Sequence, residues 1–160
     1  MTLTATRVIP THRPLSVLTA FWLLMILGIS ALAGGIALTF GSAGSGMAPP
    51  ADWLDAIPVV DSWVIPGLVL GLGFGLGSLV TAYGVWRKPH WGFVSSVETL
   101  TKHHWSWIAA ILIGLGHIVW IGLELLFFPE LSVLQAFYGP VGLALLLLPF
   151  TPSMSEHLKA

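Results

Sequence analysis

Cysteine is absent from the 160-residue sequence, which excludes disulfides, thiolate metal ligands, iron–sulfur clusters and thiol catalysis. Charge is scarce as well, because Asp, Glu, Lys and Arg make up 8% of the residues, against about 25% in an average soluble domain. Hydrophobic residues make up 56%. Such a chain has too few polar groups to cover its surface, so we expect lipid to be the solvent for most of it. The formal net charge of −1 gives no reason to expect a nucleic-acid partner.

Several kinds of catalytic and cofactor site are also missing. No set of ligands has the spacing of a zinc site, and no serine lies in a nucleophile elbow. The glycines from Gly71 to Gly75 lack the third glycine and the preceding strand of a dinucleotide-binding loop. The interval from His103 or His104 to His117 is similar to that in membrane cytochromes with two b-type haems. Each haem would need a second axial histidine, however, and the other apolar runs contain none. We therefore expect no metal, no haem at His117 and no other cofactor.

The sequence does contain four long apolar runs, each close to the roughly 20 residues that a helix needs to cross a bilayer. They predict an all-α protein, a single membrane domain built as a four-transmembrane-helix antiparallel bundle, with spans at 14–40, 64–86, 105–128 and 131–150. A short leader precedes the first span, and a polar tail follows the fourth. Residues 31–33 resemble a signal-peptide cleavage site, but the first run exceeds the roughly 7–15 apolar residues of a signal peptide, so we expect a retained helix.

The positions of the basic residues predict the orientation of the bundle. Four spans place all of them on one side of the membrane: Arg7, Arg13, Arg87, Lys88, Lys102 and Lys159. Under the positive-inside rule, both termini and the 87–104 loop are cytoplasmic, and the 41–63 loop lies outside. Trp53 and Trp63 in the outer loop suit the membrane interface, although two buried tryptophans in an irregular loop would fit equally well. We expect a multi-pass protein of the bacterial inner membrane.

Two local patterns refine the predicted helices. Residues 95–98 fit a Ser-x-x-Glu capping box, and Glu98 is spaced to pair with Lys102 one turn later. We therefore predict a helix that starts near Ser96 and runs without a break into the third span. In the fourth span, Pro140 removes a helical hydrogen bond and predicts a bend. Pro129 is expected to end the third span.

Small residues line one face of the second predicted span. Its glycines follow small-xxx-small spacing, which lets another helix approach closely in lipid: Gly67, Gly71, Gly73, Gly75 and Gly77. This stripe and the sparse polar chemistry favour a non-enzymatic accessory or scaffold subunit. Its expected partners are membrane lipids and either a larger membrane complex or a second copy of the chain.

Polar residues inside the third and fourth spans suggest an alternative function. Ionisable groups are costly in lipid and therefore point to a functional site. His117, Trp120 and Glu124 share one helical face, with His117 and Glu124 about 10 Å apart along the axis, too far to bond directly. In the fourth span, Gln135 lies at the depth of Glu124 and Tyr138 one turn deeper, while Ser30 of the first span lies level with His117. These three residues complete the candidate set. These side chains either tie the helices together or line a pocket for a small apolar or amphiphilic molecule, on which the protein would act as a binder or an enzyme.

Short apolar motifs also carry a resemblance. With residues 34–38 (GGIAL), the 61–67 entry to the second span (DSWVIPG), Trp120, Glu124 and Gln135, the chain resembles small four-span bacterial integral membrane proteins. That resemblance implies the topology and brings no known activity. The spacing of an intramembrane His, Trp and Glu is also similar to that in sterol isomerases of the emopamil-binding type, which have more spans and more acidic residues.

Overall fold

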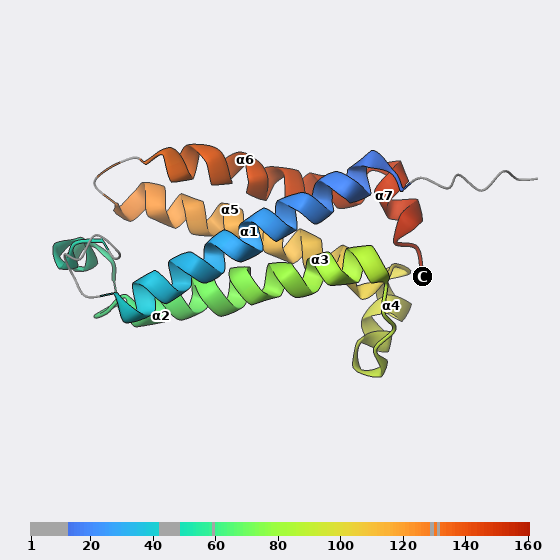
Figure 1. Ribbon diagram of the computed structural model, residues 1–160, viewed down its shortest axis with the longest axis horizontal. Coiled ribbons are helices and arrows are strands. Elements are labelled where there is room, and N and C mark those ends of the chain that lie inside the picture. Colours follow the sequence, from blue (N-terminus) through green and yellow to red (C-terminus); the bar gives the residue numbers. More distant parts are fainter. Residues whose placement is uncertain (1–12, 42–48, 59, 129, 131) are drawn as a thin grey trace, which may run out of the picture.

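All regular structure in the described part of the chain is helical. The computed structural model describes residues 13–41, 49–58, 60–128, 130 and 132–160, so the leader before Arg13 and Pro129 lie outside the described residues. Four helices within these ranges are long and apolar enough to cross a membrane, as predicted: Leu15–Phe40, Val64–Arg87, Trp105–Phe127 and Val133–Phe150. They correspond to α1, to α2 with α3, to α5, and to α6 with η4 (Figure 1).

The second long helix changes its winding in the middle. It consists of α2 (Val64–Leu68), the π-helix η2 (Val69–Leu76) and α3 (Gly77–Arg87), and we call it the α2–α3 helix. The Gly77 N–H bonds the carbonyl of Leu72, five residues earlier, as the wider turn requires. Three of the eight residues of η2 are glycines. Because glycine has a weak preference for the α-helix, this stretch adopts the wider π-helical turn at little cost.

The fourth long helix begins with a capping box. In α6 (Val133–Leu147), the Ser132 hydroxyl accepts a hydrogen bond from the N–H of Leu134, and the Ser132 N–H donates to Oε1 of Gln135 at 2.6 Å. The helix stays α-helical on both sides of Pro140 and continues as η4 (Leu148–Phe150). Gln135 is therefore oriented by the cap, which matters for the site below.

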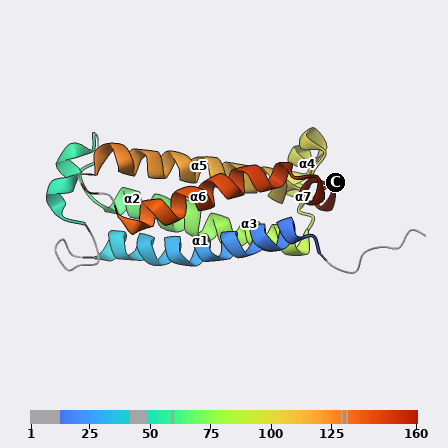
Figure 2. The same cartoon turned by 90° about the horizontal axis from the view of Figure 1, so that it is seen from above.

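The long helices pack as two pairs. Helix α1 (Leu15–Phe40) lies along the α2–α3 helix, and α5 (Trp105–Phe127) lies along α6, while α3 against α5 and α1 against α6 join the pairs (Figures 1 and 2). The start of α1 and the C-terminus lie at the same end of the bundle, which also carries α4 and α7 (Figure 1). We call this the α7 end, and the opposite one, which carries η1 (Ala51–Ala56), the η1 end.

Aromatic side chains gather at the η1 end. The ring centroid of Phe128 lies 5.2 Å from that of Trp53 and 6.0 Å from that of Trp63. Trp63 is buried, so it packs inside the protein rather than standing free at an interface. The loop between the first two long helices is thereby attached to the end of α5.

The core is densest at the α7 end, and the C-terminal segment is part of it. The predicted polar tail is wrong, because helix α7 (Pro152–His157) fully buries Met154, and the following Leu158 is fully buried as well. These two side chains join α1, α3 and α6 in one cluster, which includes Val17, Leu24, Leu27, Val85 and Leu145. The Leu158 carbonyl also accepts a hydrogen bond from the N–H of His104 at 2.7 Å. Burial of two large apolar side chains outweighs the polar composition of the segment.

The predicted unbroken helix from Ser96 into the third span is also wrong. Helix α4 (Ser95–Thr101), which follows η3 (Gly92–Val94), stops at Lys102, a left-handed residue with φ of 60°, and α5 starts afresh at Trp105. The expected capping box and the pairing of Glu98 with Lys102 are not formed either. Glu98 instead accepts a hydrogen bond from the Trp105 N–H at 3.2 Å. The positive end of a long helix attracts this carboxylate more strongly than an exposed lysine does.

Candidate functional site

Five of the six predicted polar residues come together between α5 and α6. Helix α5 places His117, Trp120 and Glu124 on its inner face, and α6 supplies Gln135 and Tyr138. We call these five residues the α5–α6 cluster. Phe74 of η2 lies against it, with its ring centroid 5.4 Å from that of His117 and 5.8 Å from that of Trp120.

His117 is buried without a hydrogen bond. Its exposed fraction is 3%, and no described residue gives either ring nitrogen a hydrogen-bond partner. Its neighbours are apolar groups. The ring centroid of Tyr138 lies 5.8 Å from that of the imidazole in an edge-on arrangement, and a Cβ placed on Gly142 would lie 3.2 Å from Cδ2 of His117. Leaving a buried polar group unsatisfied costs about 1–3 kcal/mol, and such groups are uncommon in folded proteins.

Glu124 is held by its neighbours on both helices. The indole N–H of Trp120 donates to Oε1 of Glu124 at 2.6 Å. Gln135 lies beside the same carboxyl group, and because its own Oε1 accepts from Ser132, its amide N–H₂ remains to donate. Gln135 is the residue of the fourth span that lies beside Glu124, while Tyr138 packs on His117 one turn deeper.

Ser30 is the predicted residue that the structure does not bring into the cluster. Its hydroxyl donates within its own helix, to the carbonyls of Ile26 at 2.7 Å and Leu27 at 3.1 Å. A serine in an apolar helix commonly satisfies its hydroxyl on the preceding turn. Sequence depth alone had placed Ser30 level with His117, but depth does not specify which way a helix is rotated.

The glycine stripe of the α2–α3 helix meets α1 of the same chain. A Cβ on Gly35 of α1 would lie 2.5 Å from Cα of Gly71 and 2.7 Å from the carbonyl oxygen of Gly67. Gly75 meets Leu32 of α1 in the same way. Of the other two predicted packing glycines, Gly77 faces Ile113 of α5, and a Cβ on Gly73 would meet no described atom within 4 Å beyond its own turn of helix.

Sequence reasoning missed a second polar cluster, at the α7 end. The carboxylate of Glu98 lies 3.7 Å from Nε2 of His104 and 3.6 Å from Nδ1 of His90, in addition to its bond from the Trp105 N–H. His104 is the N-cap residue of α5, since its Nδ1 accepts from the N–H of Ser106. A His-His pair directly before an apolar helical run was the available signal, but histidine is a rare N-cap.

The bonds of His104 require its uncharged form. With Nδ1 accepting, Nε2 carries the proton and donates to the carbonyl of Pro89 at 3.1 Å, which also accepts from the indole of Trp105. Burial lowers the pKa of His104 below its ordinary value of 6.5, although the Pro89 carbonyl and the Glu98 carboxylate act in the opposite direction. This cluster therefore serves to cap α5 and to attach the 89–104 segment to it.

Neither cluster is arranged as a metal centre. Among the residues that the structure describes, no three His, Asp or Glu side chains are grouped so that they could hold a metal ion. The α5–α6 cluster instead combines one unsatisfied imidazole, one bonded carboxyl group and aromatic walls, which together suit the polar group of an organic ligand. Comparison with known proteins adds no assignment, because no protein-family model, curated protein or solved structure matches the chain.

Proposed function

We propose that this protein binds the polar group of a small amphiphilic molecule at the α5–α6 cluster, within the membrane. The observation that carries the proposal is His117, whose two ring nitrogens are buried at 3% exposure with no partner among the described residues. Packing alone would have been served better by an apolar side chain, since it would avoid the cost of desolvating the imidazole. A bound polar group would supply the missing hydrogen bonds.

The chemistry of the cluster indicates the class of ligand. An uncharged imidazole has one donor and one acceptor, and a hydroxyl group can satisfy both. The rings of Phe74 and Tyr138 pack edge-on against the imidazole, and Trp120 packs on Phe74, so aromatic surface suited to an apolar skeleton lies beside His117. The cluster therefore fits an alcohol with an apolar body that partitions into the bilayer.

The accessory-subunit hypothesis stays a prediction, with less support than the sequence offered. Its main argument was the glycine stripe as a surface for a partner helix. Gly67, Gly71 and Gly75 instead allow close approach of α1 within the chain. Substituting them would therefore disturb the fold itself, and it would not report selectively on a partner.

The proposal includes the orientation of the chain in the bacterial inner membrane. The basic residues that the structure describes belong to segments at the α7 end, before α1, at the end of α3, after α4 and after α7: Arg13, Arg87, Lys88, Lys102 and Lys159. The positive-inside rule then places the α7 end in the cytoplasm and the η1 end outside. His117 lies at the middle of α5, and Glu124 and Gln135 lie toward the η1 end, so a ligand bonded to His117 would extend from the centre of the bilayer into its outer half.

The test is the identity of small molecules that copurify with the protein. Wild type, His117→Phe and Ser30→Ala are purified in mild detergent from the same membranes, extracted with organic solvent and compared by mass spectrometry. His117→Phe keeps a planar ring of similar size and removes both nitrogens. Ser30→Ala is the matched control, because Ser30 bonds only its own helix. We expect an alcohol enriched with wild type and Ser30→Ala and depleted with His117→Phe.

Two results would overturn this proposal. One is the same set of extracted molecules from all three proteins. The other is a His117→Phe variant that gains thermal stability in the presence of native lipid extract, because a bound hydroxyl group would make the loss of the imidazole unfavourable. A more stable His117→Phe variant would show that no bound molecule forms hydrogen bonds with the imidazole.

A further inference from the structure

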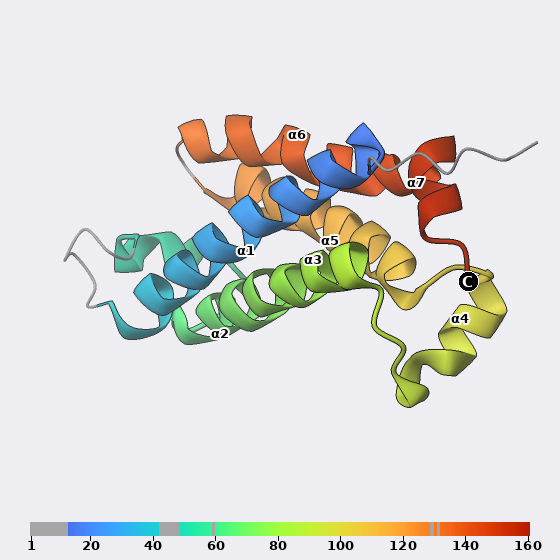
Figure 3. The ribbon, with the colours of Figure 1, turned by 45° about the vertical axis from the view of Figure 1, so that its right-hand side comes forward.

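Helix α4, which contacts the start of α5, carries apolar side chains that the described chain leaves exposed. With the preceding η3 it projects sideways from the α7 end of the bundle (Figures 1 and 3). Phe93 lies in η3, stacked on Trp91, and Val97 and Leu100 lie three residues apart on α4, which places these two on one side of the helix. The exposed fractions of Phe93, Val97 and Leu100 are 82%, 36% and 84%. Three large apolar side chains exposed together on a lateral segment mark an interaction surface.

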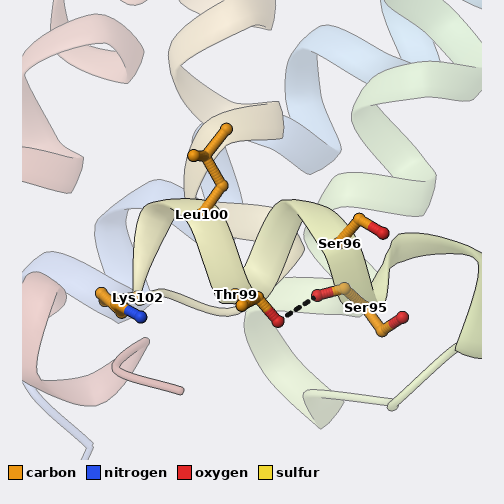
Figure 4. Close-up of a pocket in the computed structure, with 5 residues that line it drawn as sticks. All are labelled: Ser95, Ser96, Thr99, Leu100 and Lys102. Atoms are coloured by element: carbon orange, nitrogen blue, oxygen red, sulfur yellow. Dashed lines mark hydrogen bonds between the residues drawn. The ribbon is translucent and has the colours of Figure 1, made fainter.

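The rotation of α4 is set by its polar contacts. Glu98 points toward α5, where it accepts from the Trp105 N–H, and so fixes which side of α4 faces the bundle. Leu100 points away from Thr99 and Lys102, and all three residues border one shallow depression (Figure 4). The helix therefore has an apolar side and a polar side, and neither is covered by the rest of the described chain.

The position of α4 in the bundle and the charge around it indicate what covers its apolar side. The segment connects the end of α3 with the start of α5, so it lies at the level where both long helices reach their basic end. The basic side chains at this end are Arg13, Arg87, Lys88, Lys102 and Lys159, and the acidic ones are Glu98 and Glu156. The carboxylate of Glu98 is already bonded to α5, so the exposed charge is mainly positive.

We propose that residues 92–101 lie along the membrane surface, with Phe93, Val97 and Leu100 inserted among acyl chains and Lys102 against anionic lipid headgroups. An amphipathic helix in the plane of the interface buries its apolar face about 5–10 Å into the boundary between headgroups and acyl chains. The left-handed backbone at Lys102, with φ of 60°, turns the chain from this lateral direction into α5. The inference depends on insertion of the long helices and is independent of any ligand at His117.

The absence of cysteine makes a site-specific test direct. Single variants Leu100→Cys and Thr99→Cys are spin-labelled in nanodiscs of phosphatidylcholine and phosphatidylglycerol. Collision with oxygen, which concentrates in the acyl region, is compared with collision with a water-soluble nickel chelate. We expect the label at position 100 to relax more with oxygen and less with the chelate than the label at position 99. Thr99 is the matched control because it is its exposed neighbour on the same helix.

Each other pattern overturns the proposal. Equal access of the nickel chelate to both positions would place the apolar side in water. Loss of access to both reagents at position 100 would show a protein cover, either a second copy or another chain. Phe93→Cys serves as a second variant if Leu100→Cys fails to fold, with the same expected shift toward oxygen.

The role of anionic lipid has its own variant. Lys102→Asn removes the charge and keeps a residue that tolerates the left-handed conformation. We expect it to reduce the oxygen preference of the label at position 100 in nanodiscs that contain phosphatidylglycerol. In phosphatidylcholine alone the variant and its parent should agree. The same loss in both lipids, or in neither, would overturn the contribution of headgroup charge.

Discussion

One of the closest helix contacts among the described residues supplies the sharpest stability prediction. Gly35 of α1 faces the α2–α3 helix, and a Cβ placed there would lie 2.5 Å from both Cα and N of Gly71. This is about 1 Å shorter than the optimal separation of non-bonded carbon atoms, near 3.5 Å. The atoms in the way belong to backbone, so no side-chain rotation can relieve the clash. Gly35→Ala must therefore push the two helices apart.

The magnitude follows from two opposing contributions. Separating closely packed helices to admit one methyl group costs about 1–3 kcal/mol. Alanine also favours the helix over glycine by up to about 1 kcal/mol. The neighbouring substitution Gly34→Ala gains the same helix preference, but its Cβ meets only the Cδ2 of Leu70 at 3.1 Å, a side-chain atom that can move. We expect Gly35→Ala to be less stable than Gly34→Ala by about 1–3 kcal/mol.

The assay is reversible unfolding in mixtures of mild and denaturing detergent, followed by tryptophan fluorescence. The difference between adjacent glycines of one helix removes general effects of the substitution on insertion and helicity. Equal stability of the two variants, or greater stability of Gly35→Ala, would refute the described packing of α1 against Gly71. It would also mean that the glycine stripe is free to pack against a partner helix.

The remaining predictions concern the α7 end. Glu98→Gln weakens the interaction with the positive end of α5, so it should lower the free energy of unfolding by about 1 kcal/mol in the same detergent assay. The control is Glu156→Gln, which should change the free energy of unfolding little because Glu156 is exposed. A larger loss for Glu156→Gln would contradict this. Burial lowers the pKa of His104 below 6.5, so the unfolded chain binds this proton more readily than the folded one, and stability should fall as the pH drops below about 6.5. Unfolding between pH 8 and about pH 5 checks the sign, and His104→Gln should flatten the dependence. A stability that rises toward acid would count against the capping role of His104.

Part of the candidate site could be predicted from the spacing of residues in the sequence. His117, Trp120 and Glu124 had to share one side of a helix because of the helical period, and the short connection to the fourth helix brought Gln135 and Tyr138 to the same depth. Spacing did not reveal that Trp120 would donate to Glu124 or that His117 would have no partner. Those outcomes depend on rotamers, and rotamers follow from neighbours that spacing does not specify.

The sequence by itself determined the four apolar helices, since composition and run length decide which segments can satisfy their backbone groups away from water. Tertiary structure decided the rest. It assigned the glycine stripe to α1, left Ser30 out of the cluster, broke the helix before Trp105 and buried Met154 of the C-terminal segment. Each depends on which face of one element meets another. The physical reason is that hydropathy specifies how much surface a helix must bury, whereas the partner is chosen by shape and by the hydrogen bonds available at contact.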